Sequence, residues 1–183
     1  MTVKIVLLNG VGSAGKSSIA RALQGMTAEP YLHVAMDAFL EMLPEALQEN
    51  MPGFAYRTSW ENGKPSVATE TGPVGRRAMQ GMRHAIAAMA GQGNNLIVDD
   101  VMLGGEMAQY QELLSDFALF RVGVFAPLDV LEARESARGD RLPGLARWQF
   151  ERVHEGQHYD LEVDTSLLSA QECALRIQQR FRL

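Results

Sequence analysis

The chain has 183 residues, of which 46% are hydrophobic and 21% are charged, a balance typical of a single globular domain. Its formal net charge of −5 argues against a nucleic-acid-binding surface, and no apolar run approaches the roughly 20 residues that a membrane span needs. The single cysteine, Cys173, excludes an internal disulfide, and its apolar spacing with Ile177 and Phe181 predicts a buried thiol. With no signal peptide recognisable at the N-terminus, these features favour a cytoplasmic protein without nucleic-acid or membrane partners.

The first predicted unit is a strand, a glycine-rich loop and a helix. Residues 3–8 are an apolar, β-branched run, and residues 17–24 carry apolar side chains at helical spacing. Between them, residues 10–17 read GVGSAGKS, which matches the phosphate-loop pattern G-x-x-x-x-G-K-[ST] in the setting that this pattern requires. The N–H groups of such a loop and the positive end of the helix dipole converge on phosphate oxygens. We therefore expect the chain to bind a nucleoside triphosphate.

The residue types within the loop predict their roles. Lys16 would reach the β- and γ-phosphates, and the Ser17 hydroxyl would ligate Mg²⁺. The expected nucleotide-binding residues are Gly10, Gly12, Ser13, Ala14, Gly15, Lys16, Ser17 and Ser18.

A second strand is expected near residues 32–36, ending at Asp37, followed by a helical pattern over 38–48 that Pro44 interrupts. A carboxylate at the carboxyl end of a strand in a doubly wound sheet can take the proton of an acceptor hydroxyl. Aspartate is also a favourable N-cap for the helix that would begin at Ala38. Asp37 is therefore a candidate general base, with the helix cap as the alternative role.

The stretch 49–73 departs from the alternation of strands and helices. It is rich in proline and glycine, carries Phe54, Tyr56 and Trp60, and contains Asn62-Gly63, which is a hairpin-turn signal. A long excursion with aromatic residues in an α/β domain is often a substrate lid or a pocket wall. The alternative is a surface flap without function.

The rest of the chain alternates helical and strand patterns. We expect helices over 74–90 and around 107–114 and 145–153, strands over 96–98, 117–126 and 159–163, and a last helix opened by a capping box at Ser169. This order predicts an α/β fold with a five-stranded, mostly parallel sheet and helices on both faces, in one domain over 1–183.

Asp99 and Asp100 end the third predicted strand, where an acidic group can hold Mg²⁺ or its water shell. Strand register decides which of the two faces the metal, and we take Asp99, with Ser17, as the candidate ligand. The alternative is that both aspartates cap the turn before Gly104-Gly105.

Three arginines, Arg134, Arg138 and Arg141, recur at helical spacing and would share one helix face. Cations that close over the γ-phosphate favour phosphoryl transfer, so residues 130–145 are a candidate lid. Glu132 and Glu135 also allow a solvated, salt-bridged helix. His154 has neither metal-ligand spacing nor an obvious partner, and we expect it to be structural.

Several stretches together resemble the chloramphenicol phosphotransferases: LNGVGSAGKSSIARALQ (8–24), MDAF (36–39), IVDDVMLGG (97–105), ESARGDR (135–141) and VHEGQHYDLEVDTS (153–166). The resemblance covers most of the chain and is weakest over 49–73. It implies a phosphate-loop fold like that of nucleotide kinases, and ATP-dependent transfer to the primary hydroxyl of chloramphenicol or a similar small molecule. It maps Asp37 onto the proposed general base of the family, the loop onto the ATP site, and the arginine segment onto the closing lid. Arg138 is then a catalytic cation, with Arg134 and Arg141 binding the nucleotide.

Two alternative functions stay open. One is a zeta-toxin-like kinase that phosphorylates a nucleotide sugar, and the other is a switch or binding module that hydrolyses a nucleoside triphosphate to drive a partner. A guanine-specific switch would carry an Asn-Lys-x-Asp segment, which this chain lacks. The acceptor, the preference for ATP over GTP and the oligomeric state are left open by the sequence.

Overall fold

A five-stranded sheet forms the centre of the computed structural model, which describes residues 2–139 and 142–183. The strand order is β2-β5-β1-β6-β7, and every pairing in this sheet is parallel. The expected five strands are thus confirmed, and the sheet is parallel throughout. Its strands are β1 (Lys4–Asn9), β2 (Tyr31–Ala35), β5 (Asn95–Asp100), β6 (Ala118–Phe125) and β7 (Leu161–Asp164).

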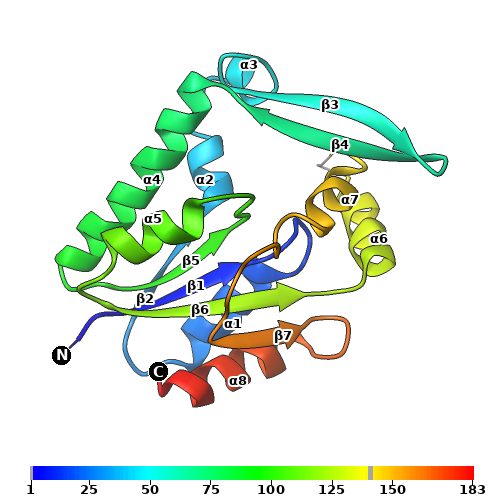
Figure 1. The fold of residues 1–183 in the computed structure, drawn as a ribbon. Coiled ribbons are helices and arrows are strands. Elements are labelled where there is room, and N and C mark those ends of the chain that lie inside the picture. The colour runs from blue at the N-terminus through cyan, green and yellow to red at the C-terminus, as the bar shows by residue number, and fades with distance from the viewer. Residues whose placement is uncertain (1, 140–141) are drawn as a thin grey trace.

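Helices cover both faces of the sheet, with α1 and α8 on one side and α4 and α5 on the other (Figure 1). In the described part of the chain, no helix combines the length and the apolar character needed to cross a membrane. The helices are α1 (Lys16–Met26), α2 (Met36–Leu40), α3 (Glu45–Gln48), α4 (Pro73–Gly91), α5 (Glu106–Leu113), α6 (Leu128–Arg138), α7 (Leu145–Phe150) and α8 (Ala170–Phe181).

The two-sided core explains why the strands read as continuous apolar runs. Successive side chains of a strand point to opposite faces, so β1 contributes Val6 and Leu8 to the α1–α8 layer and Ile5 and Leu7 to the α4–α5 layer. Cys173 lies buried on α8 in the first of these layers, as its spacing predicts. This burial holds the carboxyl edge of the sheet in place.

The stretch 49–73 contains a β-hairpin, formed by β3 (Phe54–Glu61) and β4 (Lys64–Thr71). Its turn is Asn62-Gly63, with φ values of 51° and 76°, because a two-residue hairpin turn of this kind needs positive φ at both positions. The turn predicted from sequence is therefore confirmed. The hairpin extends over α7 (Figure 1), where the Val67 N–H donates to the Gly144 carbonyl at 2.9 Å.

Helices α6 and α7 are joined by a buried carboxylate. Glu135 on α6 is 3% exposed, and its two oxygens accept from the N–H groups of Gly144, at 2.7 Å, and Ala146, at 2.8 Å. Glu132, one turn earlier, pairs with Lys64 of the hairpin and with Arg147 of α7. We call the assembly of α6, α7 and the hairpin the α6–α7–hairpin unit. The alternative that Glu135 belongs to a solvated, salt-bridged face is wrong, because its carboxylate is buried and caps the start of α7.

We expect Glu135→Ala to lower the free energy of unfolding by roughly 2–4 kcal/mol, because two buried N–H donors lose a charged acceptor. Glu132→Ala is the matched control on the same helix, and its partly exposed ion pairs should be worth less than about 1 kcal/mol. Urea unfolding of both variants provides the measurement, and equal losses would contradict this account of Glu135.

Candidate active site

The loop between β1 and α1 curls tightly at the carboxyl edge of the sheet. Ser13 and Gly15 adopt positive φ values of 66° and 91°, and Gly15 is the residue from which α1 begins. Gly10 lies so close to β6 that a Cβ there would meet the Val124 carbonyl oxygen at 2.4 Å. This backbone path and the N-terminus of α1 line a cavity of about 520 Å³. Both features favour an anionic ligand.

Two side chains from distant parts of the chain hold the loop. Gln149 of α7 accepts a hydrogen bond from the Gly12 N–H at 2.8 Å, and the Thr165 hydroxyl donates to the Ala14 carbonyl at 2.9 Å. Arg134 in turn donates to the hydroxyl and the carbonyl of Thr165, at 2.8 and 2.7 Å. Neither role was predicted from the sequence: Gln149 has no motif around it, and Thr165 lies in the stretch 153–166 that carries the family resemblance without any role assigned to it.

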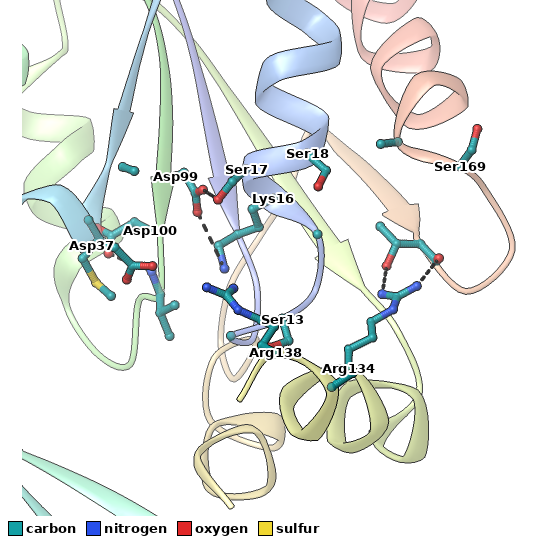
Figure 2. A pocket seen from close by; sticks show the side chains of 18 of the residues that line it. Ser13, Lys16, Ser17, Ser18, Asp37, Asp99, Asp100, Arg134, Arg138 and Ser169 are labelled. Carbon is teal, nitrogen blue, oxygen red and sulfur yellow. Dashed lines mark hydrogen bonds and ion pairs between the residues drawn. The ribbon is translucent and has the colours of Figure 1, made fainter. Parts of the chain in front are cut away.

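The donors in this cavity fit a triphosphate. Lys16 is 6% exposed, and its ammonium group donates to the carbonyls of Gly10 and Val11, which keeps the charge at the loop. The Ser13 hydroxyl is buried and has no hydrogen-bond partner among the described residues, so it can serve a ligand oxygen. Figure 2 shows Lys16 and Arg138 reaching into this cavity.

The predicted metal-binding pair is in contact. The Ser17 hydroxyl donates to Asp99 Oδ2 at 2.6 Å, and Lys16 Nζ lies 3.7 Å from Asp99 Oδ1. Burial raises the pKa of Asp99, but the charge of Lys16 and the contacts with His33 and Ser17 outweigh burial and lower that pKa below its usual value. Asp99 is therefore an anion at neutral pH, and a hydroxyl beside a carboxylate suits Mg²⁺.

Strand register separates the two aspartates of β5. Asp100 is held by α5 instead: the Tyr110 hydroxyl donates to its Oδ2 at 2.8 Å, and burial raises its pKa. Asp99 is thus the residue placed against Ser17. Within residues 2–139 and 142–183, no group of three or more His, Cys, Asp or Glu side chains could hold a metal by itself. A magnesium ion at Ser17 and Asp99 would therefore share its coordination with phosphates and water.

A second cavity of about 540 Å³ adjoins the first. Its walls come from α4, from the hairpin and from α7, and they include the aromatic residues Phe54, Tyr56 and Trp148. Four residues line both cavities: Met36, Asp37, Asp100 and Val101.

Asp37 lies at the junction of the two cavities. Strand β2 ends at Ala35, which is the N-cap of α2, so Asp37 stands in the first turn of this helix. The alternative that Asp37 caps a helix starting at Ala38 is wrong, because the helix begins two residues earlier and has no side-chain cap. A carboxylate in this place is accessible from both cavities.

The structure describes two of the three arginines of the predicted cluster. Arg134 and Arg138 lie one turn apart on α6, and both line the loop cavity. Arg141 falls outside the described residues, so its predicted role stays a prediction. The hairpin lines the second cavity through Phe54, Tyr56, Thr69 and Thr71, which agrees with the interpretation of 49–73 as a pocket wall.

His154 has partners that the sequence analysis did not find. Its ring stacks on Phe125 with centroids 3.9 Å apart, and its Nδ1 lies 2.7 Å from the Tyr159 hydroxyl. Asn9, the last residue before the loop, donates to the same hydroxyl and to the Val153 carbonyl, both at 2.8 Å. Burial, with the nearby Lys16 charge, lowers the pKa of His154 to about 4. His154 is therefore a neutral structural residue behind the loop.

Comparison with known proteins agrees with this architecture. The family described as chloramphenicol phosphotransferase-like protein matches residues 3–182. A relative in Mycobacterium tuberculosis strain H37Rv, provisionally named O-phosphotransferase Rv2636, is 32% identical over 186 residues, covering 98% of this chain and 82% of the relative.

Solved structures share the fold at low identity. APS kinase CysC of Mycobacterium tuberculosis, solved with AMPPNP and APS, has a TM-score of 0.67 at 17% identity, covering 100% of this chain and 99% of its own. The tunicamycin resistance protein of Deinococcus radiodurans has a TM-score of 0.68 at 18% identity, and the match covers 99% of this chain and 96% of that protein. Shikimate kinase of Acinetobacter baumannii has a TM-score of 0.62 at 13% identity, and the match covers 99% of this chain and 94% of that enzyme.

The lowered pKa of His154 predicts a loss of stability in mild acid. The pKa of about 4 in the folded protein lies below the 6.5 of an unperturbed histidine, so the unfolded chain binds more protons between these values. The free energy of unfolding should fall as pH drops from 6.5 towards 4, with His154 contributing roughly 1–2 kcal/mol once the solvent screening of this half-buried ring is allowed for.

Urea titrations between pH 4.5 and 7 test this, with His154→Phe expected to show a weaker pH dependence than the parent. The exposed His158 is the control site, and His158→Asn should keep the parental slope. An unchanged slope in His154→Phe would contradict the assignment of a half-buried, neutral ring.

Proposed function

The chain belongs to the chloramphenicol phosphotransferase-like family, and from this premise we propose that it transfers the γ-phosphoryl group of ATP to a hydroxyl of a small molecule. The observation that carries the proposal is the meeting of two cavities at Asp37. One cavity has the loop, the cations and the carboxylate that a Mg²⁺-bound triphosphate needs. The other has the size and the mixed aromatic and polar lining of a small-molecule site.

In the proposed reaction Asp37 takes the proton of the acceptor hydroxyl as the oxygen attacks the γ-phosphorus. The new O–P bond forms while the bond from the γ-phosphorus to the β,γ-bridging oxygen breaks, and ADP leaves with that electron pair. Lys16 and Arg138 stabilise the charge on the phosphates as it shifts towards the leaving group. When bound at Ser17 and Asp99, Mg²⁺ would supply charge neutralisation for the phosphate oxygens.

The primary hydroxyl of chloramphenicol is the first acceptor that we propose, since the family is named for this transfer. The second cavity supports an acceptor of this size, because Phe54, Tyr56 and Trp148 offer aromatic surface around the Asp37 carboxylate. Arg83 and Gln80 of α4 add polar groups on the same wall. A nucleotide-sugar acceptor or a switch without acceptor are the competing functions that the following assay separates.

Acceptor-dependent ADP release tests the proposal. The assay supplies ATP and Mg²⁺ with chloramphenicol, other hydroxylated antibiotics, sugars and nucleotide sugars, and the products are identified by mass spectrometry. We expect ADP release to rise with one alcohol acceptor and the product to gain one phosphoryl group. ADP release that is independent of every acceptor, together with a stable protein partner, would support a switch instead.

Asp37→Asn keeps the shape of the side chain but cannot accept the proton. We expect kcat to fall by about 10²–10⁴-fold with little change in the affinity for ATP, because the carboxylate acts only on the acceptor hydroxyl. Steady-state kinetics and calorimetric ATP binding measure the two quantities. Asp116→Asn, at an exposed position, is the matched control and should keep parental kinetics. Unimpaired turnover in Asp37→Asn would remove Asp37 from the reaction.

Arg138→Ala is expected to lower kcat and kcat/KM together, because its guanidinium would meet the phosphoryl group chiefly in the transition state. Arg138→Lys should recover little of the loss, since a point charge cannot replace a bidentate fork. Arg176→Ala, exposed on α8, is the control. If both Arg138 variants turn over like the parent, α6 is not a catalytic lid.

A further inference from the structure

One side chain is shared by the loop and the second cavity. Gln149 is 7% exposed, and its Oε1 accepts the hydrogen bond of the Gly12 N–H at 2.8 Å, across 137 residues of sequence. The same residue lines the cavity assigned above to the acceptor, beside Leu145 and Trp148 of the same helix. The Gln149 amide is thus hydrogen-bonded to the phosphate loop and also lines the second cavity. A ligand in either cavity can change the conformation of this side chain.

Helix α7 is bonded to both other parts of the α6–α7–hairpin unit. Its start is capped by Glu135 from α6, the helix that carries Arg134 and Arg138 into the loop cavity. The residue just before α7, Gly144, accepts a hydrogen bond from Val67 of the hairpin. An acceptor that packs on the hairpin and on α7 would therefore contact a helix whose Gln149 is hydrogen-bonded to the phosphate loop.

We propose that Gln149 is a positioning residue that couples the two sites, so that nucleotide and acceptor each strengthen the binding of the other. This inference rests on the proposed function, because it takes the second cavity as the acceptor site.

The physical basis is the geometry of the Gly12 peptide. Its N–H donates to Gln149, so the hydrogen bond fixes the orientation of this peptide plane and of the loop that follows it. An acceptor against α7 restricts the rotamers of Gln149, and a loop closed on phosphates restricts Gly12. The ligand that binds second then finds Gln149 and Gly12 already ordered by the first, so it loses less conformational entropy on binding. By thermodynamic linkage, each ligand strengthens the binding of the other by the same factor.

The chain offers an optical probe for this coupling. It has two tryptophans, of which Trp148 lies in the acceptor cavity and Trp60 is 72% exposed on the hairpin. In a Trp60→Phe background, all tryptophan emission comes from Trp148, one residue from Gln149. Binding of AMPPNP with Mg²⁺ at the loop should then change the emission of Trp148, although the nucleotide occupies the other cavity.

The test compares this response in Trp60→Phe alone and with Gln149→Met, which keeps the side-chain length but cannot accept the Gly12 hydrogen bond. Calorimetry measures AMPPNP binding independently, and the affinity should weaken about tenfold, because the loop is no longer pre-organised by the Gly12 hydrogen bond. At saturating AMPPNP the Trp148 response should disappear. Gln178→Met is the matched control: Gln178 of α8 donates to the carbonyl of Met26, at the end of α1, and neither residue lines either cavity.

A second variant guards against an unfolded mutant. Gln149→Glu keeps an oxygen for the Gly12 N–H but adds a negative charge near the phosphates, so it should bind AMPPNP less tightly while the Trp148 response survives at saturation. With an acceptor found by ADP release, the KM for that acceptor should fall about fivefold or more between low and saturating ATP in the parent, and stay constant in Gln149→Met.

A full Trp148 response in folded Gln149→Met at saturating AMPPNP would overturn the proposed coupling and leave the kinase assignment intact. A parent KM for acceptor that is independent of ATP would also overturn it. If the parent protein bound no AMPPNP at all, the proposed function would fail, and the coupling with it.

Discussion

The parallel pairing of β1 between β5 and β6 is the constraint on which the site depends. Because all three strands run in one direction, their carboxyl ends meet at one edge, where Leu8 is in register with Asp99 and Asn9 with both Asp100 and Gly123. The phosphate loop begins at that edge and cannot move away from it, since β1 is buried on both faces. The contact between Ser17 and Asp99 follows directly from this register.

The second cavity depends on elements that lie outside the sheet. The hairpin, α4 and α7 enclose it, and the α6–α7–hairpin unit is held together by the buried carboxylate of Glu135. The two cavities are therefore lined mainly by different parts of the fold. The sheet edge supplies the groups that suit a phosphoryl donor, and the surrounding unit supplies walls of the cavity that we propose for the acceptor. Helix α2 lies where both meet, and it places Asp37 on the boundary.

Local sequence signals predicted much of this arrangement. The loop pattern, the apolar strands, the Asn62-Gly63 turn and the Ser169 capping box each depend on neighbouring residues, and the structure confirms each of these elements. The choice of Asp99 over Asp100 needed the strand register, which sequence does not supply. The start of the next helix also differs from the sequence-based alternative, in which Asp37 would be the N-cap. Strand β2 ends at Ala35, and the helix that carries Asp37 already begins at Met36.

What the sequence could not reveal are single polar residues whose partners lie far away along the chain. Gln149 binds Gly12 across 137 residues, Thr165 binds Ala14 across 151, and His154 finds Phe125 and Tyr159 only in the folded core. A solvated face was the alternative that the sequence left open for Glu135, yet its carboxylate turns inward to cap α7. The roles of such residues arise from tertiary packing, which no local sequence pattern specifies.

The most direct test of the account is an electron-density map of the protein crystallised with AMPPNP and Mg²⁺. The account predicts the triphosphate in the loop cavity, with Mg²⁺ at Ser17 and Asp99 and the γ-phosphate facing Asp37 and the second cavity. A triphosphate bound elsewhere, or a γ-phosphate separated from the second cavity by protein, would contradict the claim that the two cavities form one active site.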